Sequence, residues 1–281
     1  MSIARNIDGL KQADAQFELI RAEIARHHLS PKLKILYVGS NSASESYIKH
    51  KKEKAAAVGI DAEVVSFPVT VDQQQVVAKI EELNRSKTVN GIIVQLPLPD
   101  GFGTGELLSR VDPTKDVDGL HPLNFGRLMG DGEPEFFPPT PVGIVLLLDN
   151  YEVEIPGANI VIVGMGRLVG KPLTQMLVNR EATVLCLQER TANPSSLIRQ
   201  GEVVITGVGV PNLINKSDIS PGAVVIDAGI SRQDGRLVGD VNYSEVRKVA
   251  GLITPVPGGV GPMTVACLLK NTVKACLIQN E

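Results

Sequence analysis

The sequence predicts an α/β protein with two domains, each built on a parallel sheet. Short apolar runs alternate with helix-forming segments along the chain. A proline cluster, Pro138-Pro-Thr-Pro141, interrupts this alternation near the middle of the 281 residues. Because 43% of the residues are apolar, both halves can bury a core. We expect one domain at residues 1–139 and a second at 140–262, with a final helix at 263–281 packing back on the first.

The first half of the chain predicts alternating helices and strands. Apolar residues recur at helical spacing near residues 10–28. Two capping-box patterns, Ser42-Ala-Ser-Glu45 and Thr70-Val-Asp-Gln73, predict where the next two helices start. The predicted strands are the apolar runs at residues 33–38, 62–67 and 91–96.

A glycine-rich turn follows the first predicted strand of the second half. The apolar run at 158–163 breaks into Gly164-Met165-Gly166, and helix-forming residues resume near Gly170. Such a turn brings backbone N–H groups close to a pyrophosphate at the positive end of the helix. The spacing G-x-G-x-x-x-G is one residue longer than the common dinucleotide fingerprint. The turn therefore indicates a dinucleotide site, with an ordinary tight turn as the alternative.

The next apolar run supports a dinucleotide site. Residues 182–188 read as a strand that ends at Glu189, about twenty residues past the glycines, where an acid accepts hydrogen bonds from the ribose. A solvated residue at a strand end is the alternative for Glu189. Further runs at 202–206, 223–227 and 252–254 are spaced as parallel strands, and 263–279 predicts the last helix.

Composition excludes several classes of partner. A net charge of −3 gives no general affinity for nucleic acid, and no apolar run approaches the roughly 20 residues of a membrane span. The N-terminal residues contain no apolar signal core, so we expect a cytoplasmic protein. The three cysteines and four histidines are scattered without ligand spacing, so we expect neither a disulfide framework nor a metal.

One predicted helix carries candidate chemistry. Tyr47, Lys51 and Lys54 share a face, and a lysine beside a tyrosine in a partly apolar cleft can exchange protons near neutrality. A solvated lysine-rich face is the alternative. Tyr47-x-x-x-Lys51 also matches the pair of short-chain dehydrogenases, but there it follows the nucleotide-binding glycines. Here it precedes them, which counts against that class.

Three further stretches could contact a ligand. Gln95 lies near the carboxyl end of a predicted buried strand, where ligands of open α/β sheets gather. Asp118, in an Asp-Val-Asp-Gly loop, could hold a cationic or amino-bearing group, or could form an Asx turn. The rigid loop Pro257–Pro262 has few side chains, so it allows close approach of a ligand, although a plain tight connection would look similar.

These stretches, taken in order, resemble the methylenetetrahydrofolate dehydrogenase/cyclohydrolase family. The most specific is the run Thr254-Pro-Val-Pro-Gly-Gly-Val-Gly-Pro-Met-Thr264. The other motifs are Tyr47-x-x-x-Lys51, Val94-Gln-Leu-Pro-Leu-Pro99, Lys115-Asp-Val-Asp-Gly119, Pro138-x-Thr-Pro141 and the Gly164 turn. The resemblance covers nearly the whole chain. It implies a folate-binding catalytic domain, a Rossmann-type dinucleotide-binding domain with a cleft between the two, and a homodimer.

The resemblance also implies an activity in one-carbon metabolism. 5,10-Methylenetetrahydrofolate would give hydride to NAD or NADP, and the methenyl product would be hydrolysed to 10-formyltetrahydrofolate. Lys51 matches the catalytic lysine, Tyr47 the pterin-stacking tyrosine, Gln95 the residue that positions the lysine, and Asp118 the pterin-gripping aspartate. The remaining expected substrate-binding residues are Val94, Leu96, Pro257, Gly258, Gly259, Val260 and Gly261. The expected cofactor-binding residues are Gly164, Met165, Gly166, Glu189, Ile230 and Thr264.

This sequence departs from the family pattern at the expected cofactor site. The familiar Gly-Arg-Ser turn is here Gly164-Met165-Gly166, and the familiar His-Ser is here Gln188-Glu189. Losing a cation and replacing a hydroxyl with a carboxylate disfavours a 2′-phosphate, so we expect NAD to be preferred over NADP. Arg167 and Arg190 are nearby cations that could still accept the phosphate.

Elsewhere, Glu53 stands where the family usually has a lysine, which we expect to weaken binding of an anionic glutamyl tail. Two other readings stay open. One is a different two-domain NAD(P)-linked dehydrogenase acting on a small amino or hydroxy acid. The other is a non-catalytic folate- or nucleotide-binding regulator.

Overall fold

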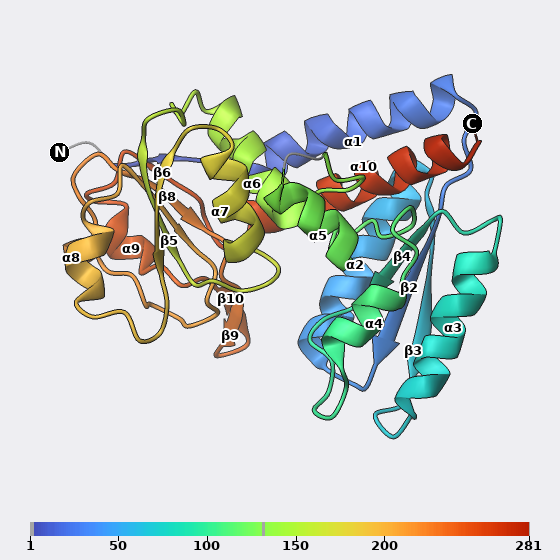
Figure 1. Ribbon diagram of the computed structural model, residues 1–281. Helices are drawn as coiled ribbons and strands as arrows, with labels where there is room; N and C mark the ends of the chain where they lie inside the picture. Colours follow the sequence, from blue (N-terminus) through green and yellow to red (C-terminus); the bar gives the residue numbers. More distant parts are fainter. Residues whose placement is uncertain (1–2, 131–132, 281) are drawn as a thin grey trace. The chain divides into compact units, whose positions relative to one another are not determined.

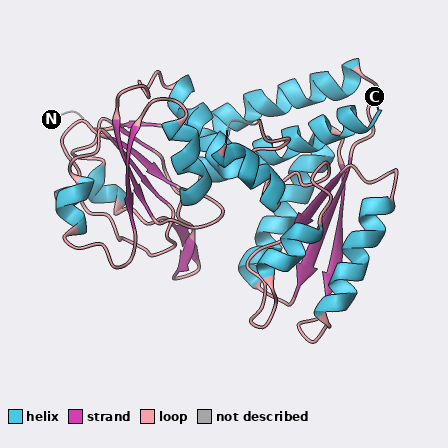
Figure 2. Ribbon diagram, viewed as in Figure 1, coloured by secondary structure: helices cyan, strands magenta, loops and turns pink. Residues whose placement is uncertain are grey.

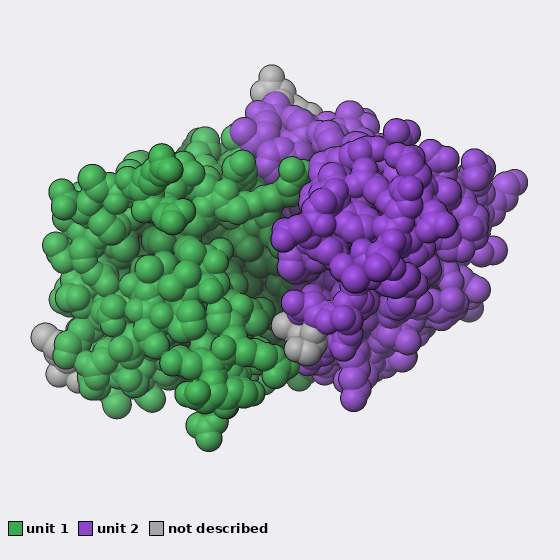
Figure 3. Space-filling model, turned by 90° about the horizontal axis from the view of Figure 1, so that it is seen from below, with its two compact units in different colours: residues 1–14, 140–264 green, residues 15–139, 265–281 purple. Residues whose placement is uncertain are grey.

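Two separate parallel sheets organise the chain in a computed structural model that describes residues 3–130 and 133–280 (Figures 1 and 2). The chain divides into two compact units, coloured in Figure 3. Unit 1 comprises Met1–Asp14 and Thr140–Thr264, and unit 2 comprises Ala15–Pro139 and Val265–Glu281. None of the helices in the described part of the chain is long and apolar enough to cross a membrane.

Unit 2 contains a three-stranded parallel sheet in the order β3-β2-β4. Its strands are β2 (Lys32–Val38), β3 (Asp61–Phe67) and β4 (Gly91–Val94). The helices that lie wholly within the unit are α2 (Ser42–Val58), α3 (Gln73–Arg85), α4 (Thr104–Arg110) and α5 (Pro122–Met129). Helices α1 (Gly9–Arg26) and α10 (Val260–Asn280) each contribute most of their residues to this unit. The periodic apolar runs therefore predicted the three strands to within two residues at each end.

Helix α3 shows how the core of unit 2 forms. Its apolar residues recur at helical spacing, so Val76, Val77, Ile80 and Leu83 lie buried on one face. They pack with apolar residues of β2 and β4 in one cluster.

The predicted helix starts need correction. Asp72 rather than Thr70 caps α3, accepting from the Gln74 N–H at 2.8 Å. Asn41 caps α2, accepting from the Ser44 N–H at 3.0 Å.

Unit 1 contains a six-stranded sheet in the order β1-β11-β8-β7-β5-β6, with every neighbouring pair parallel. Its strands are β1 (Arg5–Asn6), β5 (Asn159–Val163), β6 (Thr183–Leu187), β7 (Val203–Thr206), β8 (Val224–Asp227) and β11 (Leu252–Ile253). Strands β9 (Ser231–Gln233) and β10 (Arg236–Val238) form a separate antiparallel pair. The helical elements are α6 (Pro139–Asn150), α7 (Gly170–Val178), α8 (Pro194–Ile198), the short 3₁₀ helix η1 (Lys216–Asp218) and α9 (Tyr243–Val246).

The order of these strands determines where a ligand can bind. From β5 the chain moves to β6 on one side and then to β7 on the other, so the strand order reverses beside β5. In open parallel sheets, a crevice forms at the carboxyl ends of the strands at this reversal. The loops after β5 and β7 therefore form the expected binding edge of unit 1.

The N-terminal segment lies in a different unit from the one expected. We predicted that residues 1–139 form one domain, but Arg5 and Asn6 pair with Leu252 and Ile253 of β11. The backbone N–H of Ile7 also donates to the Ile253 carbonyl at 2.8 Å. A strand of two residues carries no detectable periodicity, so this pairing had no sequence signal.

The buried face of α3 leads to a stability prediction. Ile80 is fully buried, and Ile80→Ala should lower the free energy of unfolding by about 2–5 kcal/mol because it leaves a cavity. The control is Val69→Ala, at a side chain that is 60% exposed, which should change it by less than about 0.5 kcal/mol. Chemical denaturation of both variants measures this, and equal losses would contradict the packing of α3.

Candidate active site

Helix α2 places a buried lysine beside an aromatic ring. Lys51 is only 4% exposed, although its neighbours Lys49 and Lys52 are exposed. Its Nζ atom lies 4.7 Å from the centroid of the Tyr47 ring, one helical turn earlier. Lys49 and Lys52 therefore lie on a solvated face of the helix, whereas Lys51 does not.

Gln95 connects this lysine to the end of β4. Its backbone N–H donates to the Leu36 carbonyl at 2.9 Å, which extends the sheet by one residue. The Lys51 Nζ donates to the side-chain Oε1 at 3.0 Å, and the Gln95 Nε2 donates to the Leu96 carbonyl at 2.7 Å. Because both ends of the amide are bonded, its oxygen is held toward the lysine. Val94 belongs to the adjoining hydrophobic core, and the partly buried Leu96 packs against it.

The loop that carries Asp118 is fixed by its neighbours on either side. The Lys115 Nζ donates to the carbonyls of Leu83, Asn84 and Ser86 at 3.2, 2.8 and 2.6 Å. Asp116 accepts from the backbone of Leu120 and His121 and from the side chain of Asn124. Gly119 has a φ of +63°, and a Cβ there would lie 2.7 Å from the backbone of residues 136–138. Sequence reasoning did not identify these supporting roles.

Lys51 and Asp118 influence each other electrostatically. Burial lowers the pKa of Lys51 below its ordinary value, and the Asp118 carboxylate partly opposes this effect. Burial likewise raises the pKa of Asp118, and the Lys51 charge opposes that shift. Burial therefore favours the neutral form of the lysine amine. Such an amine can accept a proton from a bound reactant or from water.

The glycine turn of unit 1 brings the end of β5 into close backbone contact with the start of α7. Gly164 has a φ of +97°, and a Cβ on Gly170 would lie 2.0 Å from the Gly164 carbonyl oxygen. Helix α7 can therefore start directly against the turn only because residue 170 is glycine. A Cβ on Gly166 would meet nothing within 4 Å, so this position faces open space. These features fit a dinucleotide pyrophosphate at the start of α7.

The other predicted cofactor residues lie around the same unit. Met165 is partly buried, and its sulfur lies 3.9 Å from the Thr174 hydroxyl. Glu189 is exposed just after β6, and Ile230, after β8, is 54% exposed. Thr264 lies in the first turns of α10, where its hydroxyl donates to that of Thr140 at 3.0 Å.

The Pro257–Gly261 loop is tightly built. It leads from β11 into α10, and Val260 and Gly261 already belong to that helix, so the predicted loop is helical at these two positions. The Gly258 carbonyl accepts from the Leu10 N–H at 3.1 Å. A Cβ on Gly259 would lie 2.6 Å from the Pro255 carbonyl oxygen. This loop and the predicted cofactor residues belong to unit 1. Tyr47, Lys51, Val94, Gln95, Leu96 and Asp118 belong to unit 2.

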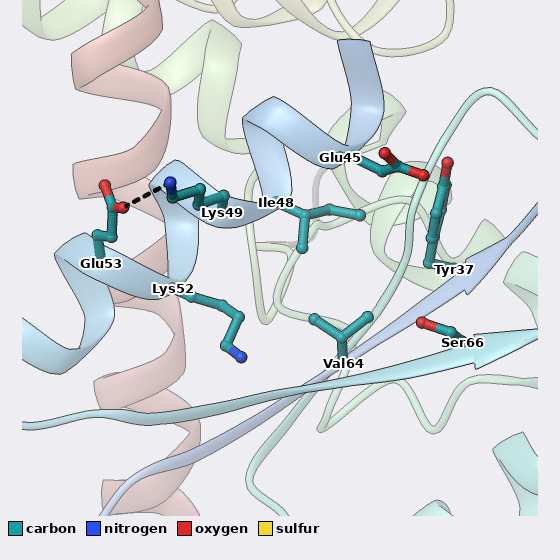
Figure 4. A pocket seen from close by; sticks show the side chains of 8 residues that line it. All are labelled: Tyr37, Glu45, Ile48, Lys49, Lys52, Glu53, Val64 and Ser66. Atoms are coloured by element: carbon teal, nitrogen blue, oxygen red, sulfur yellow. Dashed lines mark ion pairs between the residues drawn. The ribbon is translucent and has the colours of Figure 1, made fainter. Parts of the chain in front are cut away.

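A surface hollow of about 560 Å³ lies elsewhere on unit 2 (Figure 4). Its lining comes from α2, β2 and β3 and comprises Tyr37, Glu45, Ile48, Lys49, Lys52, Glu53, Val64 and Ser66. None of the predicted site residues lines it. The Lys49 Nζ lies 4.0 Å from the Glu53 carboxylate, so part of its charge is already paired. Among the described residues, no group of three or more His, Cys, Asp or Glu side chains is placed to hold a metal ion.

Two domain models of one known protein family match this chain, one on each side of the proline cluster. The model of the tetrahydrofolate dehydrogenase/cyclohydrolase catalytic domain matches residues 7–118. The model of the NAD(P)-binding domain of the same family matches residues 138–280. The chain belongs to this family.

Relatives within the tetrahydrofolate dehydrogenase/cyclohydrolase family match over nearly full length. The bifunctional protein FolD of Exiguobacterium sibiricum is 42% identical, covering 96% of this chain and 98% of that protein. FolD of Thermus thermophilus is 41% identical, covering 99% and 98%. The structure of the Campylobacter jejuni FolD enzyme superposes with a TM-score of 0.94 at 38% identity, covering 98% of this chain and 99% of that one. That of Trypanosoma brucei FolD, complexed with NADP and an inhibitor, has a TM-score of 0.96 at 34% identity, and each chain is fully covered.

The two glycines beyond Gly164 provide a matched test of how closely the backbone packs at the start of α7. Gly170→Ala should destabilise unit 1, because the new Cβ would collide with backbone. Gly166→Ala should leave stability unchanged, because its Cβ would meet nothing within 4 Å. Thermal unfolding of the two variants measures the difference. Equal losses would contradict the close approach of the backbone at Gly170.

Proposed function

We propose that this protein oxidises 5,10-methylenetetrahydrofolate with a nicotinamide cofactor and hydrolyses the methenyl product. In the first step the one-carbon bridge loses a hydride and becomes a methenyl cation. In the second step water adds to the carbon of that cation, and the bond from this carbon to one of its two nitrogens breaks. That nitrogen takes up one of the water protons, the other proton is released, and 10-formyltetrahydrofolate forms. The observation that carries the proposal is the buried Lys51 amine, held by Gln95 beside Tyr47 and coupled to Asp118.

The residues of unit 2 suit a substrate that becomes positively charged. A neutral Lys51 does not repel the methenyl cation, whereas a second fixed positive charge would raise the barrier to forming it. The Asp118 carboxylate can bond to amino groups of the pterin, and the Tyr47 ring offers a surface for stacking. Gln95 holds the lysine nitrogen in place for its proton transfer. Lys51 then accepts a proton from the attacking water.

The dinucleotide site lies on unit 1, and a bound nicotinamide would supply the hydride acceptor. Gly164 and Gly166 would admit the pyrophosphate, with the N-terminus of α7 stabilising its charge. Glu189, Ile230 and Thr264 would contact other parts of the cofactor.

Replacing the buried lysine separates the two activities. Lys51→Met should reduce hydrolysis of methenyltetrahydrofolate by about 100-fold or more, since general-base catalysis contributes at least this much. Hydride transfer should fall less, because it needs no proton transfer from Lys51. The matched control is Lys52→Met, which removes an exposed lysine on the same helix and should change neither rate. Full hydrolytic activity in Lys51→Met would remove Lys51 from this role.

We further propose that NAD is preferred over NADP. A 2′-phosphate dianion needs cationic or hydrogen-bonding partners, and Met165 and Glu189 provide neither. The exposed position of Glu189 after β6 suits instead a carboxylate that accepts from two ribose hydroxyls. Arg167 and Arg190 are exposed nearby and are the residues through which NADP could still bind.

Initial rates with NAD and NADP under identical folate concentrations test this preference. We expect a higher kcat/KM with NAD for the unmodified protein. Restoring the family pattern with Met165→Arg, Gly166→Ser and Glu189→Ser should raise kcat/KM for NADP at least about tenfold, because each change favours phosphate binding. An unmodified protein that uses NADP as well as NAD, or better, would overturn the proposal.

A further inference from the structure

A buried carboxylate lies beneath the binding edge of unit 1. Asp240 is fully buried, and its carboxylate accepts four hydrogen bonds. Oδ2 accepts from the Thr206 hydroxyl at 2.8 Å and from the Val208 N–H at 2.7 Å. Oδ1 accepts from the N–H groups of Gly209 and Val210, each at 2.9 Å. Three consecutive backbone N–H groups therefore converge on one side chain.

These bonds shape the loop that follows β7. With its N–H groups turned inward to Asp240, the loop leaves the side chains of Val208 and Val210 44% and 47% exposed. Val208 also reaches the glycine turn after β5, since a Cβ on Gly164 would lie 2.8 Å from its Cγ2. Asp240 thus acts on the glycine turn through Val208.

The same carboxylate supports the loop that follows β8. A Cβ on Gly229 would lie only 2.1 Å from the Asp240 Oδ1, so the backbone passes directly over the carboxylate. Asp227, at the end of β8, accepts from the N–H groups of Gly229 at 2.9 Å and Asp240 at 3.1 Å. Hydrogen bonds to Asp227 therefore fix both ends of the loop that carries Ile230, at Gly229 and at Asp240.

The sheet order indicates which half of a dinucleotide these loops face. Strands run β8-β7-β5-β6, with the pyrophosphate expected at the turn after β5. The adenine ribose belongs on the β6 side, where Glu189 lies. The nicotinamide half must then extend toward the loops after β7 and β8.

We propose that Asp240 is a positioning residue that fixes the two loops facing the nicotinamide half of the cofactor. The inference rests on the proposed dinucleotide-dependent function. Only a carboxylate supplies two oxygens that each accept two bonds. An asparagine of the same shape would turn an NH2 group toward two of the four donors, so both loops would have to move.

The test uses Asp240→Asn, with Asp218→Asn as the matched control. Asp218 is another buried carboxylate of unit 1, but it accepts from Asn215 and Ser195. Calorimetric titration with NAD alone should give a Kd at least about tenfold weaker for Asp240→Asn and within about twofold of the unmodified protein for Asp218→Asn. In hydrogen exchange, the amides of residues 208–210 should exchange faster while those of β5 and β8 stay protected.

Several outcomes would overturn the inference. These are an unchanged Kd in Asp240→Asn, an equal loss in Asp218→Asn, or faster exchange throughout unit 1. If Asp240→Asn does not fold, Thr206→Val removes one of the four donors, and it should weaken NAD binding by about threefold; no change would count equally against the inference. The titration contains no folate. A protein that binds NAD but does not oxidise methylenetetrahydrofolate would therefore refute the proposed function and leave the Asp240 result interpretable.

Discussion

The hydrogen bond from Lys51 to Gln95 is the interaction on which the proposed chemistry of unit 2 depends. It joins helix α2 to the end of β4 and holds an amine where burial lowers its pKa. An exposed lysine would stay protonated near neutrality and could not act as a base. The Asn41 cap at the start of α2 and the hydrogen bonds that fix the loop carrying Asp118 support this placement.

Unit 1 also relies on buried ionisable side chains, but there they fix the loops of the expected binding edge. Its binding edge consists of loops, which are usually mobile, yet they have to present backbone and small side chains in a fixed arrangement. Buried carboxylates provide the fixed points. Asp240 accepts from the N–H groups of residues 208–210 after β7, and Asp227 accepts from that of Gly229 after β8. Burial raises the pKa of Asp227 to about 6. Both units thus bury an ionisable side chain whose hydrogen bonds fix a functional surface.

The predictions from sequence succeeded where the signal was local. Apolar runs located β2 to β8 and β11 but not β1, β9 or β10, and the glycine spacing located the turn before α7. The capping-box patterns gave the right helices but the wrong caps. The cap of α2 is Asn41, one residue before the predicted Ser42, and the cap of α3 is Asp72, two residues after the predicted Thr70. The motif order also identified the family correctly, since each motif reports close packing or backbone geometry that few sequences share.

The sequence by itself determined the α/β alternation, the glycine turn and the family to which the chain belongs, because these follow from local periodicity and motif spacing. Only the tertiary structure decided that Lys51 is buried while Lys52 is exposed, since that depends on Gln95, 44 residues away. It also decided that Arg5 and Asn6 complete the sheet of unit 1 and that Asp240 lies beneath two loops. Each of these facts depends on contacts between segments that are far apart in the sequence. Patterns among neighbouring residues do not encode such contacts.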